Sequence, residues 1–183
     1  MLIALAGLPG TGKTSIAREL AKQLRATYLR VDTIEQALRS SGTLATDITA
    51  EGYVVAYRVA EENLSLGHIV IADSVNPIEI TRDAWLGVAV KANVQVVEVE
   101  IICSDPEEHR RRVETRSSDT SDLTLPTWGA VKGREYHPWN RPRIVIDTAA
   151  RAVDACVAEL LSKLPGPTQK ESAPKSSKSG GPS

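Results

Sequence analysis

The stretch that most constrains the fold is a short glycine-rich segment near the amino terminus, from Gly7 to Thr14. It matches the pattern G-x-x-x-x-G-K-[ST]. The apolar run 2–6 precedes it, and residues 13–25 follow with apolar side chains at helical spacing. A strand that leads through such a loop into a helix is the context of a phosphate-binding P-loop. The segment therefore predicts a nucleotide-binding α/β domain.

The residue types in this segment meet the requirements of a phosphate cradle. Gly7, Gly10 and Gly12 lack a Cβ, so the backbone can bring its N–H groups close to an anion. Lys13 adds a mobile cation beside the positive end of the helix, and the Thr14 hydroxyl suits Mg²⁺. We therefore expect ATP and Mg²⁺ to bind here. The expected nucleotide-binding residues are Gly7, Leu8, Pro9, Gly10, Thr11, Gly12, Lys13, Thr14 and Ser15.

The rest of the chain alternates apolar runs with segments of helical spacing. Further strands are expected at 27–31, 68–73, 94–103 and 143–147, and further helices at 34–39, 53–66, 78–91, from 106, at 128–136 and at 151–164. This alternation predicts a parallel sheet with helices on both faces, in one domain over residues 1–164. Residues 165–183 are rich in Pro, Gly, Ser and Lys, and we expect a disordered tail there.

Two aspartates follow expected strands. Ligands of a parallel sheet bind beyond the carboxyl ends of its strands, so Asp32 and Asp73 should lie beside the P-loop. Asp73 suits Mg²⁺ as a Walker B aspartate, and Asp32 can take the proton of an attacking hydroxyl. The alternatives are that Asp32 caps the next helix and that Asp73 caps a turn. Ser74 stands where motor-type AAA ATPases usually carry a water-activating glutamate, which favours transfer to a hydroxyl over hydrolysis.

Several arginines lie in the expected helix that begins near Pro106. Arg112 and Arg116 are four residues apart, so their side chains share one face of a helix. Guanidinium groups stabilise the charge on a transferring phosphoryl group, so both are candidate catalytic residues. Arg134 is a further candidate. The alternative is a solvated basic helix paired with neighbouring glutamates.

These features together resemble the small P-loop kinases grouped as the AAA-33, or zeta-toxin and chloramphenicol-phosphotransferase-like, family. Gluconate and shikimate kinases are more distant relatives. The resemblance spans residues 1–164 and depends on the P-loop, on residues 31–35 and 71–74, and on the arginine-rich helix. It implies a three-layer α/β/α P-loop NTPase fold with a five-stranded parallel sheet, strand order 2-3-1-4-5, and a lid at about 110–135.

The resemblance also assigns roles to single residues. It implies that Asp32 faces the acceptor hydroxyl as a base, and that lid arginines contact phosphate while an earlier one stacks on adenine. The segment 147–149 would approach the adenine. Gluconate and shikimate kinases carry two acids spaced D-x-D, whereas this chain has Arg30-Val31-Asp32, which argues against those two activities.

The expected function is transfer of the γ-phosphate of ATP to a hydroxyl of a small molecule, with Lys13, Asp32, Arg112 and Arg116 as catalytic residues and Thr14 and Asp73 as metal ligands. An ATP-hydrolysing switch or regulator and a nucleoside monophosphate kinase are the alternatives. The resemblance implies that the region with Tyr53, Tyr57, Arg58, Arg82 and Trp85 can line the acceptor pocket, where Tyr and Trp would suit a small amphipathic acceptor. The alternative is that these aromatic residues fill the core of a chain without Phe.

The overall charge and hydropathy narrow the expected partners. A formal net charge of −1 argues against a nucleic-acid binder that works through a broad basic surface. No apolar run is long enough to cross a membrane. We expect a soluble cytoplasmic protein, a monomer or homodimer, whose partner is a small-molecule acceptor.

Overall fold

The computed structural model describes residues 1–42, 50–116 and 125–166. Most of the expected disordered tail, and most of the polar stretch between 117 and 127 that belongs to the expected lid, therefore lie outside the described residues. Within the described ranges, no helix has both the length and the apolar character needed to cross a bilayer.

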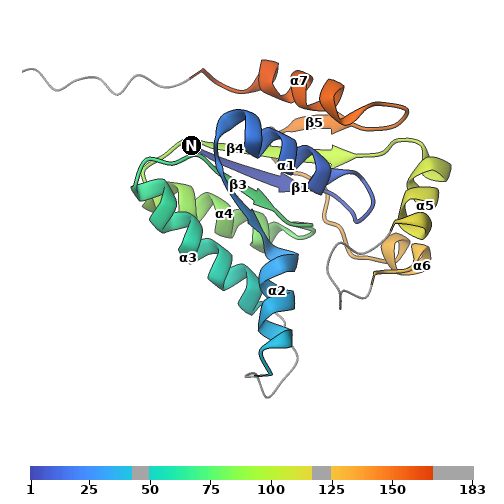
Figure 1. Ribbon diagram of the computed structural model, residues 1–183, viewed down its shortest axis with the longest axis horizontal. Coiled ribbons are helices and arrows are strands. Elements are labelled where there is room, and N and C mark those ends of the chain that lie inside the picture. Colours follow the sequence, from blue (N-terminus) through green and yellow to red (C-terminus); the bar gives the residue numbers. More distant parts are fainter. Residues whose placement is uncertain (43–49, 117–124, 167–183) are drawn as a thin grey trace, which may run out of the picture.

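Strands and helices alternate along the chain (Figure 1). The strands are β1 (Leu2–Ala6), β2 (Thr27–Arg30), β3 (Val70–Asp73), β4 (Val96–Ile102) and β5 (Ile144–Asp147). The helices are α1 (Lys13–Leu24), α2 (Val31–Ser40), α3 (Glu51–Ser65), α4 (Glu79–Lys91), α5 (Pro106–Thr115), α6 (Trp128–Lys132) and α7 (Val153–Lys163). Each expected strand and helix is present, and most of the ends differ from the expected ones by a few residues.

The five strands form one parallel sheet in the order β2-β3-β1-β4-β5, which confirms the predicted topology. Successive side chains of β1 point to opposite faces of the sheet. Ile3 and Leu5 pack with α1 and α7, whereas Leu2 and Ala4 pack with α3 and α4. Figure 1 shows these two helix layers above and below the sheet, with α5 and α6 beyond the carboxyl ends of the strands.

The aromatic side chains of α3 and α4 belong to the core. Trp85 is fully buried, and the Tyr57 ring meets it edge-on at 4.7 Å between centroids. Tyr53 lies 6.0 Å from Tyr57. The structure therefore supports the interpretation that these residues fill the core, and not the one that they line an acceptor pocket.

The passage from β2 to α2 differs from the prediction. We expected Asp32 to follow a strand over 27–31 and to precede a helix over 34–39, with capping of that helix as an alternative role. The helix instead begins at Val31, and its N-cap is Arg30, in extended conformation, so Asp32 is not the cap. Val31 is 2% exposed and Ile34 packs against the same core cluster, and their three-residue spacing in a helix places both on one face. Asp32 consequently lies in the first turn of α2.

Candidate active site

The P-loop follows β1 directly and turns around the main-chain carbonyl of Leu8. The Thr11 hydroxyl donates to this carbonyl at 2.9 Å, and Lys13 Nζ donates to it at 3.0 Å. Gly10 has φ +86°, and a Cβ there would lie 2.5 Å from Val113 Cγ2 of α5. Only glycine combines this backbone conformation with so close a neighbour.

Three segments that are distant in the sequence hold the loop from outside. The Gly7 N–H donates to the Val75 carbonyl at 3.0 Å. The ring of His109, on α5, bonds to the Pro9 carbonyl through Nε2 at 2.8 Å, which requires the proton on Nε2. The Thr148 hydroxyl, just after β5, lies 2.9 Å from the Thr11 carbonyl. These three contacts therefore constrain the shape of the loop.

Sequence analysis did not single out His109, although it holds the loop. Its side chain is 7% exposed and meets Trp128 of α6 edge-on at 5.1 Å between centroids. Its hydrogen-bond partner precedes it by 100 residues. No local pattern in the sequence links two positions so far apart.

Lys13 and Asp73 lie together at the base of the site. Burial lowers the pKa of Lys13 to about 8, and the carboxylates of Asp73 and Asp32 oppose this shift. Asp73 is 3% exposed and accepts a 2.8 Å hydrogen bond from the Tyr28 hydroxyl through Oδ2. The structure thus brings the P-loop lysine and both predicted aspartates into one electrostatic group.

The donor set fits Mg²⁺. Thr14 and Asp73 line the same pocket. The described residues contain no group of three or more His, Cys, Asp or Glu side chains that could hold a metal. Mg²⁺ commonly takes one or two protein oxygens and completes its shell with phosphate oxygens and waters. A hydroxyl and a single carboxylate beside a phosphate cradle match that requirement.

Helix α2 presents one hydrophilic face to the pocket, formed by Asp32, Glu35, Gln36 and Arg39. The Arg30 guanidinium lies 3.6 Å from Asp32, and that of Arg39 lies 3.4 Å from Glu35. Burial raises the pKa of Glu35, and the nearby Asp32 carboxylate adds to this effect while Arg39 opposes it. Glu35 is a pocket carboxylate that sequence analysis overlooked, although its three-residue spacing from Asp32 was a signal for it.

The arginines of α5 have different surroundings. Arg110 pairs with Glu114 at 2.9 Å on the exposed side. Arg112 donates to Glu108 at 2.6 Å and to the Thr148 hydroxyl at 2.7 Å. Arg112 therefore reaches from α5 across to the segment after β5, next to the P-loop.

Two further arginines extend the positive charge around Lys13. Arg116 immediately follows α5, and Arg134 follows α6; both line the pocket. The charges of both groups lower the pKa of Lys13, so they lie within electrostatic reach of its ammonium group. The predicted pair Arg112 and Arg116 thus shares one pocket with Arg134.

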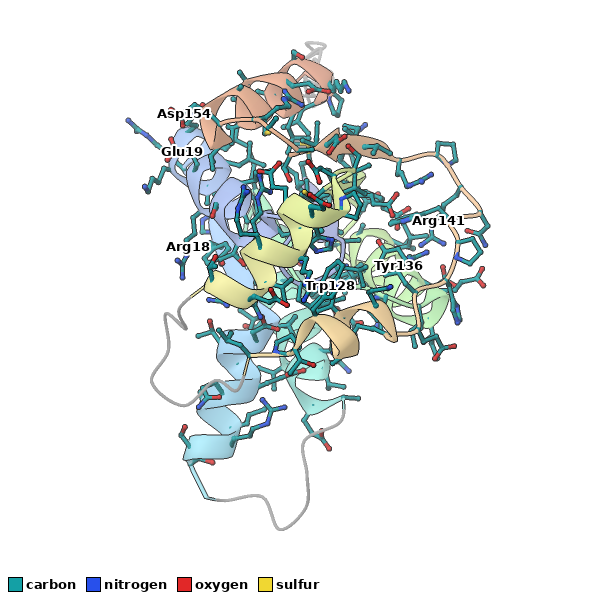
Figure 2. All side chains as sticks on the ribbon, turned by 90° about the vertical axis from the view of Figure 1, so that its right-hand side faces the viewer. Arg18, Glu19, Trp128, Tyr136, Arg141 and Asp154 are labelled. Atoms are coloured by element: carbon teal, nitrogen blue, oxygen red, sulfur yellow. The ribbon has the colours of Figure 1, made fainter. Side chains whose placement is uncertain are left out.

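The pocket that these elements enclose has a volume of about 810 Å³. Its lining residues come from the P-loop and α1, from α2, from the end of β3, and from the segments around α5 and α6, which lie at the edge that faces the viewer in Figure 2. The lining residues are Pro9, Gly10, Gly12, Lys13, Thr14, Ser15, Arg18, Arg30, Asp32, Glu35, Gln36, Arg39, Asp73, Ser74, Val75, Arg112, Thr115, Arg116, Leu125, Pro126 and Arg134.

Residues 133–143, here called the anchored segment, connect α6 to β5 along the side of α4 (Figure 2). Arg82 of α4, 3% exposed, fastens this segment. Its guanidinium lies 4.1 Å from the Trp139 ring centroid and 5.0 Å from that of Tyr136. It donates to main-chain carbonyls on both sides, those of Asn76, Pro77, His137 and Pro138.

Ion pairs with β4 fasten the same segment at its far end. Arg141 bonds to Glu98 at 2.6 and 2.8 Å, and Arg143 bonds to Glu100 at 2.6 Å. The Tyr136 hydroxyl also donates to Glu100, at 3.0 Å. The part of the chain that carries Arg134 is therefore tied to the central sheet and to α4.

Comparisons with known proteins agree with this architecture. A family model described as an AAA domain, AAA_33, matches residues 2–138. No curated protein matches the chain. Among solved structures, the chain is similar to the APS kinase CysC of Mycobacterium tuberculosis in complex with AMPPNP and APS, at 21% identity and a TM-score of 0.66, over 88% of this chain and 95% of that one.

Two other solved structures have comparable similarity. A gluconokinase from Sinorhizobium meliloti is 18% identical with a TM-score of 0.59, over 87% of this chain and 89% of that one. Kti12 of Chaetomium thermophilum, in complex with ADP-AlF3, is 21% identical with a TM-score of 0.65, over 91% of this chain and 100% of that one. At these identities the similarity establishes the fold, a P-loop kinase-like α/β domain.

Proposed function

Because this chain belongs to the AAA_33 family of AAA domains, we propose that it is a phosphotransferase that moves the γ-phosphate of ATP to a hydroxyl group of a small molecule. The observation that carries the proposal is the shared pocket. The P-loop and the hydrophilic face of α2 both line it, so a phosphoryl donor and a hydroxyl acceptor can lie in one pocket. Catalysis of phosphoryl transfer depends mainly on such positioning and on charge stabilisation.

On the donor side, the P-loop residues 7–15 bind the phosphates of ATP. Thr14 and Asp73 would hold Mg²⁺, which when bound neutralises charge on the β- and γ-phosphate oxygens. Tyr28 donates to one oxygen of the Asp73 carboxylate and so fixes its orientation. Arg112, held by Glu108 and Thr148 next to Gly12, contacts the nucleotide from the side of α5.

On the acceptor side, Asp32 takes the proton of the attacking hydroxyl. The hydroxyl oxygen forms a bond to the γ-phosphorus as the bond to the bridging oxygen of ADP breaks, and ADP leaves with that oxygen. Lys13 and Arg116 stabilise the charge on the transferring phosphoryl group. Ser74, which also lines the pocket, offers no carboxylate to activate water at the position after Asp73.

The experiment that tests this proposal is acceptor-dependent release of ADP. The protein is incubated with Mg-ATP and a panel of alcohols, sugars and nucleosides, and phosphorylated products are identified by mass. Asp32→Asn is expected to lower kcat by about a hundredfold to ten-thousandfold, because a general base is lost. The control is Asp154→Asn, an exposed aspartate in the first turn of α7, and it retains the wild-type rate.

The outcomes separate transfer from hydrolysis. ADP release that requires an acceptor and Asp32 supports the phosphotransferase. The phosphotransferase is contradicted if ADP is released at the same rate with every acceptor and without one, in both the wild type and Asp32→Asn. That result would assign the pocket to an ATP-hydrolysing switch or regulator. A response confined to nucleoside monophosphates identifies a nucleoside monophosphate kinase.

A further inference from the structure

The acceptor half of the pocket is strongly polar. The face of α2 contributes carboxylates, an amide and a guanidinium, and the nearby lining residues Ser74 and Val75 are small. No aromatic ring is among the described lining residues. The aromatic cluster of α3 and α4, which would suit an apolar acceptor, is in the core. The surface therefore favours an acceptor with many polar atoms.

Arg134 faces this half of the pocket from the anchored segment. Its positive charge lowers the pKa of both Glu35 and Lys13, so its guanidinium lies within electrostatic reach of each. It is exposed in the pocket. Its side chain makes no hydrogen bond or ion pair with any residue in the described ranges. A guanidinium with five donors is thus available to a ligand.

The charges of the pocket are unequal. Among the described lining residues, the cations Lys13, Arg18, Arg30, Arg39, Arg112, Arg116 and Arg134 outnumber the carboxylates Asp32, Glu35 and Asp73. Under the proposed function, Lys13, Arg112 and Arg116 are assigned to the nucleotide. Arg30 pairs with Asp32 at 3.6 Å. Arg39 and Arg134 both lie near Glu35, whose single carboxylate therefore faces two guanidinium groups.

We propose that the acceptor carries an anionic group of its own, a carboxylate or a phosphate, bound by Arg134 and Arg39 while its hydroxyl faces Asp32. Arginine matches both groups because its planar donors bind two oxygens at once. The part of this inference that gives the acceptor a reacting hydroxyl rests on the proposed function. The anion site itself depends only on the arrangement of Arg134 and the face of α2.

The first test measures anion binding without turnover. The protein is saturated with Mg-AMPPNP, so that the P-loop is filled, and is titrated by calorimetry with malonate, with inorganic phosphate, and with neutral malonamide. Arg134→Met and Arg39→Met are expected to raise the dissociation constant of the preferred anion about tenfold or more. The control is Arg58→Met, which removes the same charge from the exposed side of α3.

Binding of malonate or phosphate that depends on Arg134 and Arg39, and not on Arg58, supports the anion site and shows which group it prefers. The site is overturned if neither anion binds, if malonamide binds equally well, or if Arg58→Met weakens binding as much as Arg134→Met.

The second test measures turnover with acceptor pairs that differ only in the charged group, glycerol with glycerol 3-phosphate and ribitol with ribonate. A kcat/KM at least tenfold higher for the charged member, lost in Arg134→Met, supports an anionic acceptor. Equal turnover of both members overturns the anionic acceptor and leaves phosphotransfer intact. Anion binding that depends on Arg134, without turnover of any acceptor, overturns phosphotransfer and leaves the anion site intact.

Discussion

The proposed donor and acceptor halves of the pocket are built in different ways. The donor half is centred on a loop of consecutive residues whose main chain surrounds the expected phosphate position. Distant segments hold this loop through His109 and Thr148, and they add single side chains such as Asp73 and Arg112. The acceptor half is made of side chains, from one face of α2 and from Arg134 on the anchored segment. A main-chain site depends on backbone conformation, whereas a side-chain site depends on which helix face points inward.

This difference predicts how substitutions behave. A change in the donor half should weaken ATP binding or turnover whatever the acceptor. A change in the acceptor half should alter the response to the acceptor and leave nucleotide binding intact. The four predictions below test that separation.

The largest effect is expected for Lys13→Ala. This change removes a buried ammonium group, 7% exposed, from beside Asp73. Loss of its charge should lower kcat by about a hundredfold to a thousandfold with every acceptor, measured as ADP release. Lys22→Ala is the control, since Lys22 is 76% exposed on the same helix. A Lys13→Ala protein as active as Lys22→Ala would remove Lys13 from the reaction.

The next effect concerns the shape of the loop. Gly10→Ala places a methyl group against Val113 and requires a left-handed backbone, so it should lower the free energy of unfolding by about 1–3 kcal/mol and weaken AMPPNP binding. Gly87→Ala in α4 meets no atom within 4 Å. It should instead raise the free energy of unfolding by about 0.5–1 kcal/mol. Urea unfolding measures both, and a shift of the same sign in the two variants would contradict this account.

A smaller effect, confined to the acceptor half, is expected for Arg82→Lys. Lysine keeps the charge but cannot reach the carbonyls on both sides at once, so the free energy of unfolding should fall by about 1–3 kcal/mol. The anchored segment loosens, and KM for the acceptor rises because Arg134 is less well placed. The dissociation constant of AMPPNP should stay the same. Arg58→Lys, on the exposed side of α3, should change neither the stability nor the KM. A weaker AMPPNP affinity in Arg82→Lys would show that the two halves are coupled.

The smallest effect is expected for Tyr28→Phe, which removes the hydroxyl that donates to Asp73. The Asp73 carboxylate then turns more freely, and the Mg²⁺ concentration for half-maximal ATP binding should rise by about tenfold or less. Calorimetric titration of ATP at several Mg²⁺ concentrations measures this shift. Tyr57→Phe is the control, because the Tyr57 hydroxyl donates to the Thr81 carbonyl in the helix layer of α3 and α4, and not to Asp73. An equal shift in both variants would show that Tyr28 has no specific role.

The sequence by itself determined the strands, the helices and the P-loop, because these depend on local spacing. The apolar run of β1 and the glycines after it specify a strand and a turn whatever the rest of the chain does. The parallel order of the sheet followed from the alternation of strands and helices together with a family resemblance, and the structure bears it out.

Only the tertiary structure decided which side chains meet in the pocket. Tyr53, Tyr57 and Trp85 had the composition of an apolar binding surface, yet α3 and α4 bury them against each other. Glu35 and Arg134 are separated by about a hundred residues, and each became part of the site because α2 and the anchored segment both border the pocket beside the P-loop. The orientation of a side chain toward a site depends on how its whole element packs, and such packing joins residues that no local pattern connects.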